Sequence, residues 1–129
     1  MAVAETRAKQ AVRERLEQAA RAGQFVFYAE LAEEMGLNVE LLAHRVELQR
    51  VLDEISREEL AAGRPLLSAI CVQPTDHLPG RGFLVLGQEL GLTDPADDEV
   101  TFGIRQIKAV HAYWSELPPF GESGEGAIL

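Results

Sequence analysis

Six basic side chains in the middle of this sequence have the types and spacing that suit binding to an anionic polymer. Three of them are arginines within a stretch of helical periodicity, one follows that stretch, and two flank the glycines of residues 76–83. Arginine donates to phosphates and guanine edges, and a glycine-freed loop can follow a nucleic-acid backbone. The predicted nucleic-acid-binding residues are Arg45, Arg50, Arg57, Arg64, His77 and Arg81.

Carboxylates interleave with these arginines and support a second interpretation. Glu47, Asp53 and Glu54 stand three or four residues from a basic neighbour, a pattern typical of a salt-bridged, solvated helix face. The chain has 12 basic and 21 acidic residues, a net charge of −9 that opposes the approach of phosphate polymers. A modest alternative docking surface is the basic face near the N-terminus, formed by Arg7, Lys9, Arg13, Arg15 and Arg21.

Other chemistry finds little support in the residue pattern. The single cysteine, Cys71, lies between Ile70 and Val72 with no adjacent cation to activate it, which favours a buried packing role over thiol chemistry. The histidines lack metal-ligand spacing, and the carboxylates of residues 94–99 lack the alternation of a calcium loop. With no nucleophile–base pair or phosphate loop, we expect a non-enzymatic protein without metal or cofactor.

The first half of the chain is predicted to be helical. Apolar residues recur at intervals of three and four over residues 6–22, with Gly23 at the position of a helix C-cap. Residues 24–28 are a short strand or an extended link, residues 28–35 form a second helix, and Gly36 favours a sharp turn. Residues 39–62 continue as one long helix, or as two with a bend near His44.

The second half is predicted to contain a β-hairpin. Two short apolar runs, residues 66–72 and 83–86, are separated by the turn-forming residues 73–82. A last helix covers residues 102–114, and a Gly/Glu/Ser-rich tail covers residues 118–129. We therefore expect one α+β, mainly helical domain over residues 1–117, a winged helix-turn-helix ordered as helix, small strand, helix, helix, hairpin wing and C-terminal helix. A three-helix domain without a wing is the alternative.

The last predicted helix concentrates aromatic residues in a chain that is only 6% aromatic. These residues either cap the core or form an apolar patch that pairs two copies or docks a protein partner. The predicted interface residues are Phe102, Tyr113 and Trp114.

Several segments resemble a family of small, uncharacterised bacterial winged-helix-like proteins. The resemblance lies in residues 27–37 (FYAELAEEMGL), 51–56 (VLDEIS), 63–70 (GRPLLSAI) and 79–83 (PGRGF), and covers roughly residues 25–115. It implies the winged-helix fold and no established activity. The chain is more distantly similar to the DNA-binding half of alkylguanine-DNA alkyltransferases. Cys71 lacks the histidine and arginine of their proline-cysteine-histidine-arginine motif, so dealkylation is not expected.

Composition narrows the class of protein. With 47% hydrophobic residues and no apolar run long enough for a bilayer, the sequence predicts a folded domain and no membrane partner. The first nine residues lack an apolar signal core, so we expect a cytoplasmic location. The leading hypothesis is a winged-helix module that binds double-stranded DNA as a homodimer. The alternative is an acidic module that docks a protein partner with the C-terminal helix and does not bind nucleic acid.

Overall fold

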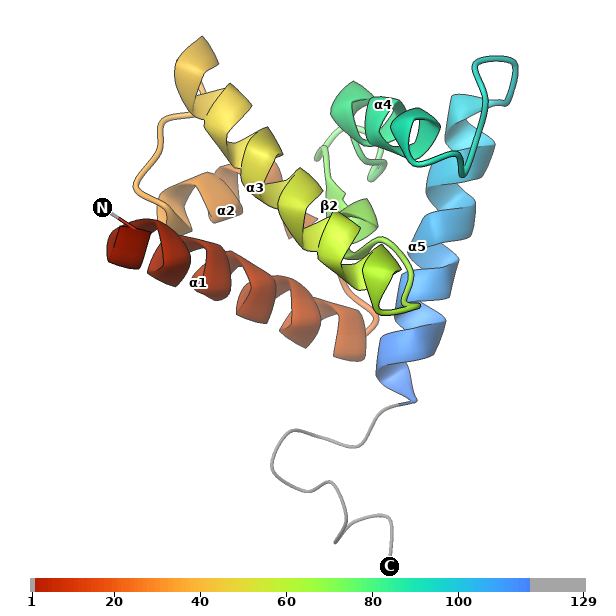
Figure 1. Cartoon of the computed structure of the whole chain (residues 1–129), viewed down its shortest axis with the longest axis horizontal. Helices are drawn as coiled ribbons and strands as arrows, with labels where there is room; N and C mark the ends of the chain where they lie inside the picture. Colours follow the sequence, from red (N-terminus) through yellow and green to blue (C-terminus); the bar gives the residue numbers. More distant parts are fainter. Residues whose placement is uncertain (1, 117–129) are drawn as a thin grey trace, which may run out of the picture.

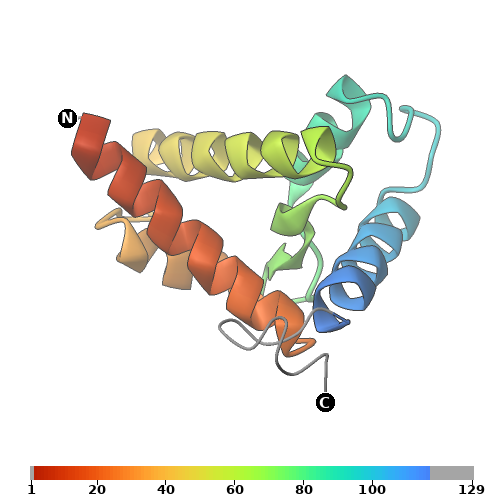
Figure 2. The same cartoon turned by 60° about the horizontal axis from the view of Figure 1, so that its bottom comes forward.

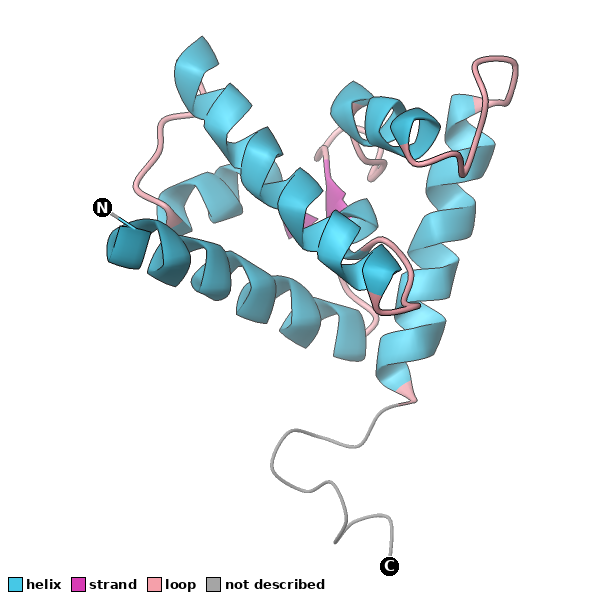
Figure 3. Ribbon diagram, viewed as in Figure 1, coloured by secondary structure: helices cyan, strands magenta, loops and turns pink. Residues whose placement is uncertain are grey.

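The computed structural model describes residues 2–116, and the side chains of residues 7–116. The predicted tail, residues 118–129, lies outside the described residues. Within them the chain forms five α-helices, one short 3-10 helix and two very short strands (Figure 3). Their order is α1 (Ala2–Arg21), β1 (Val26–Phe27), α2 (Tyr28–Glu34), α3 (Leu42–Ala61), η1 (Leu67–Ile70), β2 (Cys71–Val72), α4 (Arg81–Glu89) and α5 (Glu99–Ser115). The fold is therefore mainly helical with a small sheet.

Three long helices surround the shortest elements. Figure 2 shows α1, α3 and α5 as the sides of a triangle with η1 and β2 inside it, and η1 packs against all three helices. Each helix turns an apolar stripe inward, including Leu16 of α1, Leu52 of α3 and Phe102 of α5, all at most 1% exposed. The core therefore lies around residues 66–72, which are buried without exception.

The predicted order of helix, glycine turn and long helix over residues 28–62 is confirmed, although α3 begins at Leu42 and not at residue 39. The backbone N–H of Phe27 donates to Glu30 Oε1 at 2.8 Å, which fixes the start of α2. Gly36 ends it with a φ of +70°, the left-handed conformation that glycine adopts most easily. His44 lies in the first turn of one continuous α3, so the helix does not bend there.

The predicted hairpin wing over residues 66–86 is wrong. The run of residues 66–72 forms η1 and then β2, which pairs in parallel with β1 in the register Val26↔Cys71 and Phe27↔Val72. Residues 83–86, expected as the second strand, belong to α4. The two halves of the expected hairpin are thus a strand and a helix that do not pair, and a winged helix is not supported.

A short apolar run explains this error. Residues 83–86 (FLVL) have no period of their own, so a strand and a buried helix segment look alike in sequence. In the structure Phe83, Leu84 and Leu86 are buried while Val85 is 40% exposed, a helical and not an alternating pattern. Gly91, which follows the end of α4, has a φ of +75°. A glycine at this position is the one feature of the sequence that indicates a helix end here.

Candidate functional site

The N-terminal half of α3 carries the two most exposed large hydrophobic side chains of the described residues. Figure 1 shows it extending past α2 at the edge of the molecule. Leu42 and Val46, one helical turn apart, are 68% and 61% exposed, and Leu48 is the first buried residue of the helix. Arg45 lies between them in sequence and is also exposed.

Hydrogen bonds hold the start of this helix in place. Arg45 Nη1 donates to the carbonyl of Val39 at 2.7 Å, and the backbone N–H of Asn38 donates to His44 Nδ1 at 2.8 Å. Both bonds join the loop before α3 to its first turn. The exposed half of α3 is therefore anchored to the turn that follows α2.

A cleft of about 250 Å³ lies between this half of α3 and the first turn of α4. We call it the α3–α4 cleft. Val39, Leu48 and Gly80 contribute apolar surface, and longer polar side chains contribute the remainder. The polar side chains that line it are Tyr28, Arg45, Gln49, Gln73 and Arg81, with Gly82 completing the wall.

The first turn of α4 forms its wall because the backbone there comes close to other elements. The N–H of Gly80, the N-cap residue, donates to Tyr28 Oη at 3.3 Å. A Cβ added to Gly82 would lie 2.5 Å from Gln49 Oε1, so the end of the Gln49 side chain of α3 lies directly against the first turn of α4. Gln49 Nε2 in turn donates to Asp53 at 2.8 Å.

Burial changes the ionisation of two groups near the cleft. It raises the pKa of Tyr28 well above its ordinary value, so the phenol keeps its proton at every physiological pH. Burial also raises the pKa of Asp53, although the hydrogen bond from Gln49 and the charge of Arg57 oppose this. Tyr28 therefore remains a neutral hydroxyl donor and acceptor beside two arginines.

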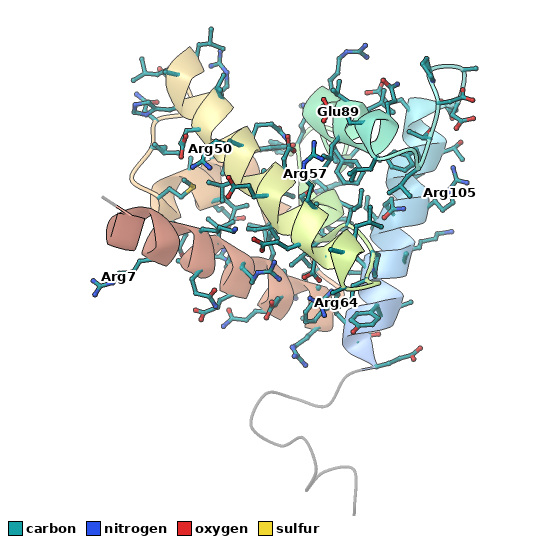
Figure 4. All side chains as sticks on the ribbon, in the orientation of Figure 1. Arg7, Arg50, Arg57, Arg64, Glu89 and Arg105 are labelled. Atoms are coloured by element: carbon teal, nitrogen blue, oxygen red, sulfur yellow. The ribbon has the colours of Figure 1, made fainter. Side chains whose placement is uncertain are left out.

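The structure separates the six predicted nucleic-acid-binding residues. Figure 4 shows Arg50, Arg57 and Arg64 spread along α3 and just beyond it. Arg50 pairs with Glu47 and Glu54 on its own helix, and Arg57 Nη2 lies 2.6 Å from Glu89 on α4. These exposed pairs fit the salt-bridged interpretation of the α3 face.

Arg64 belongs to a buried ionic cluster. Its guanidinium donates to both oxygens of Glu59 at 2.8 Å, and Arg13 Nη1 of α1 donates to the same carboxylate at 2.7 Å. Glu59 has no exposed surface. Burial would raise its pKa, but the hydrogen bonds from Arg64 and Arg13 outweigh burial and lower it. We call these three residues the Glu59 cluster; they join α1 to the end of α3.

The basic N-terminal face is also engaged within the chain. Lys9 pairs with Glu58 and Glu54, and Arg15 Nη2 lies 2.9 Å from Glu30. Arg21 covers the ring of Trp114 with its guanidinium carbon 5.4 Å from the ring centre. This face is therefore largely a structural seam between helices.

His77 and Arg81 lie near each other in sequence but have different surroundings. His77 stacks on Phe27, with ring centres 5.8 Å apart, and its φ of 56° is unusual for a residue other than glycine. Arg81 is 76% exposed, and its nearest carboxylate, Glu99, is 4.0 Å away. The fold brings Arg81 and Arg45 to one cleft, although 36 positions (81 − 45) separate them in sequence.

Two of the three predicted interface residues lie in the core. Phe102 is 1% exposed and stacks on Phe83 with ring centres 5.4 Å apart, and Trp114 is 5% exposed. Tyr113 is the exception at 36%. Phe102 and Trp114 therefore cap the core, which is the first of the two alternatives that the sequence predicted. Neither side chain presents an exposed surface to a partner.

Cys71 is fully buried, and burial raises the pKa of its thiol, which agrees with a packing role. Among residues 2–116, no three histidine, cysteine or acidic side chains gather in a way that would hold a metal ion. None of the described helices is both long enough and apolar enough to cross a membrane.

Sequence reasoning missed the neutral polar side chains of the cleft. Tyr28 was assigned only to a helix start, and Gln49 and Gln73 carried no recognised pattern. The sequence signal for this wall of the cleft is the segment Pro79–Gly82. Its proline and glycines are as typical of a helix start as of a loop.

No protein-family model matches the chain, and the searches found no similar protein among curated sequences or solved structures. The resemblance to winged-helix-like proteins therefore stays a prediction.

Proposed function

We propose that this protein is a non-enzymatic module that binds double-stranded DNA through the exposed N-terminal half of α3. The observation that carries the proposal is the exposure of Leu42, Arg45 and Val46 on a helix that follows a short helix and a glycine turn. Helix-turn-helix proteins insert the N-terminal residues of such a helix into the major groove. Apolar side chains there contact thymine methyl groups, and arginine contacts guanine or phosphate.

The charge of the protein limits this binding. A net charge of −9 repels DNA at long range, so the affinity comes from local contacts and is greatest at low salt. Arg50, Arg57 and Arg64 are neutralised by carboxylates, which leaves Arg45 and Arg81 as the principal cations on this side. We expect a small number of phosphate contacts and a modest affinity.

The test is a salt titration of binding to a labelled mixed-sequence duplex, followed by fluorescence anisotropy. We expect the logarithm of the affinity to fall with the logarithm of salt with a slope of about two to three. Arg45→Ala should weaken binding several-fold and reduce the slope by about one. Arg57→Ala is the matched control, since it lies on the same helix and already pairs with Glu89. Absence of binding at about 50 mM salt would rule the proposal out.

A second candidate function is docking of a protein partner or a second copy on α5. Val100 and Ile104, one helical turn apart, are 44% and 40% exposed, and this pair favours the candidate. Sedimentation equilibrium of the wild type and Ile104→Glu tests self-association. A concentration-dependent dimer that this substitution dissociates supports it, and a wild-type monomer at every concentration rejects the dimer.

A further inference from the structure

The α3–α4 cleft gathers hydrogen-bond donors and positive charge in an acidic protein. Arg45 reaches it from α3 and Arg81 from α4, while Tyr28 and Gln73 come from two further segments of the chain. A Cβ on Gly80 would lie 3.3 Å from Gln73 Nε2 and 3.4 Å from Tyr28 Oη, so both polar groups stand directly over the start of α4. Side chains from four segments of the chain thus line one cleft at the start of α4.

The pairing of these donors leaves capacity for a ligand. Arg50, Arg57 and Arg64 each form a salt bridge with a nearby carboxylate, and no salt bridge of the described residues includes Arg45. Arg45 Nη1 donates to the carbonyl of Val39, and the described residues show no acceptor for its other N–H groups. In the first turn of α4 the N–H of Gly80 is taken by Tyr28 and that of Phe83 by Gly80, whereas the described residues show no acceptor for those of Arg81 and Gly82. Unpaired donors at a helix N-terminus attract an anion, and the helix dipole adds to the attraction.

The nearest carboxylate does not cancel this field. Asp53 accepts from Gln49 Nε2, and its half-buried carboxyl also feels the charge of Arg57. Glu99 is 4.0 Å from Arg81, where both side chains are more than half exposed, so this contact is weak and readily exchanged. The residues that line the cleft therefore include two arginines and no acidic residue.

We propose that the α3–α4 cleft binds a phosphate group, held by Arg45 and Arg81 and by the backbone N–H groups of Arg81 and Gly82. Guanidinium groups match phosphate oxygens with paired, charge-assisted hydrogen bonds. The neutral hydroxyl of Tyr28, which accepts from the N–H of Gly80, also lines the cleft and keeps its own proton for a further bond. The volume, about 250 Å³, is below the roughly 300–1,000 Å³ of drug-sized pockets, so it suits a small anion or one phosphate of a polymer.

The phosphate has two sources, the backbone of DNA or a free phosphate compound. Only the first of these rests on the proposed function. In the first case the cleft positions the duplex for the exposed face of α3, as phosphate contacts do in DNA-binding proteins. In the second, the cleft binds its ligand without any polymer.

The experiment is an amide NMR titration of the full chain with inorganic phosphate, with sodium chloride keeping the ionic strength constant. We expect saturable shifts of the amides of Gly80, Arg81 and Gly82. Arg45→Ala and Arg81→Ala should each weaken the affinity about tenfold, or about 1.4 kcal/mol, because each removes a charge-assisted hydrogen-bond donor to the phosphate. Arg50→Ala is the matched control and should leave the affinity unchanged, since Arg50 already pairs with Glu47 and Glu54.

A parallel titration with a short duplex distinguishes the sources. If phosphate shifts these amides and the duplex displaces it, the backbone is the ligand. If phosphate binds and the duplex does not, the cleft takes a free phosphate compound, and the proposed DNA function fails alone. If the duplex binds while phosphate causes no saturable shift, or if both arginine variants bind phosphate like Arg50→Ala, the cleft inference is overturned. The high exposure of Arg81 makes its variant safe for folding.

Discussion

The two halves of α3 have similar sequences of charged and apolar residues but opposite surroundings. The C-terminal half packs against α1 and η1, and there Glu59 is fully buried between Arg13 and Arg64. The N-terminal half extends past α2, with Leu42 and Val46 exposed to solvent. One helix thus has a packed half and an open half.

The comparison shows how differently the two arginines near the ends of this helix are held. Arg64 and Arg45 are both arginines near an end of the same helix, yet Arg64 holds a buried carboxylate while Arg45 donates to a backbone carbonyl. A guanidinium that already satisfies a buried charge cannot leave it without a large loss of stability. Four predictions test this contrast, beginning with the largest expected effect.

Removing the charge of Glu59 should have the largest effect. Glu59→Gln keeps the size of the side chain but leaves Arg13 and Arg64 without their shared carboxylate, and we expect a loss of about 3 kcal/mol in the free energy of unfolding. Urea denaturation measures it. Glu58→Gln is the control, because Glu58 is exposed on the same turn and should lose less than about 1 kcal/mol. If both variants lost the same free energy of unfolding, the buried Glu59 cluster would stabilise the protein no more than an exposed ion pair.

A methyl group added where α4 packs against Phe102 of α5 should have the next largest effect. A Cβ on Gly87 would lie 2.5 Å from the ring of Phe102, which is buried and cannot turn away. Gly87→Ala should therefore destabilise the protein by about 2 kcal/mol, despite the better helix propensity of alanine. Thermal unfolding is the measurement.

Gly82→Ala is the matched control on the open side of the same helix. Its Cβ would meet only the end of the Gln49 side chain, which can rotate away. We expect unchanged or slightly higher stability. A greater loss of stability in Gly82→Ala than in Gly87→Ala would contradict the conclusion that α4 is tightly packed at Gly87 and not at Gly82.

Acid should act on the packed half. The folded protein lowers the pKa of Glu59 from its reference value of 4.5, so its stabilising effect is complete above pH 4.5 and is lost as the pH falls through the lowered value. The difference in unfolding free energy between the wild type and Glu59→Gln should stay constant near neutrality and shrink below pH 4.5. If this difference grew as the pH fell, the pKa of Glu59 in the folded protein would be raised and not lowered.

The smallest effect is expected in the open half. Leu42→Ala should change the free energy of unfolding by no more than about 0.5 kcal/mol, because Leu42 is 68% exposed. Leu52→Ala on the packed half, where the leucine is 1% exposed, should lose about 3 kcal/mol. If the proposed function holds, Leu42→Ala also weakens duplex binding in the anisotropy assay. This variant would then lose affinity for DNA while keeping its free energy of unfolding.

Much of the helical part could be predicted from the sequence. Helices α1, α2, α3 and α5 have apolar residues at intervals of three and four, and Gly23 and Gly36 take the positive φ angles expected of helix ends. The wing was wrong because residues 83–86 are too short and too uniformly apolar to carry a period. The candidate site was predicted only in part, since Arg45 and Arg81 were identified but the cleft that joins them was not.

The sequence by itself determined which residues form the long helices and where several of them end, because helix periodicity and glycine caps are local properties. It also determined an acidic, mainly helical chain with one buried cysteine. Only the tertiary structure decided that β1 pairs in parallel with β2, that Arg64 is held by Glu59, and that Arg45 and Arg81 line one cleft. Each of these joins residues through packing between separate elements, and the energy of such contacts depends on distances in space that no local pattern contains.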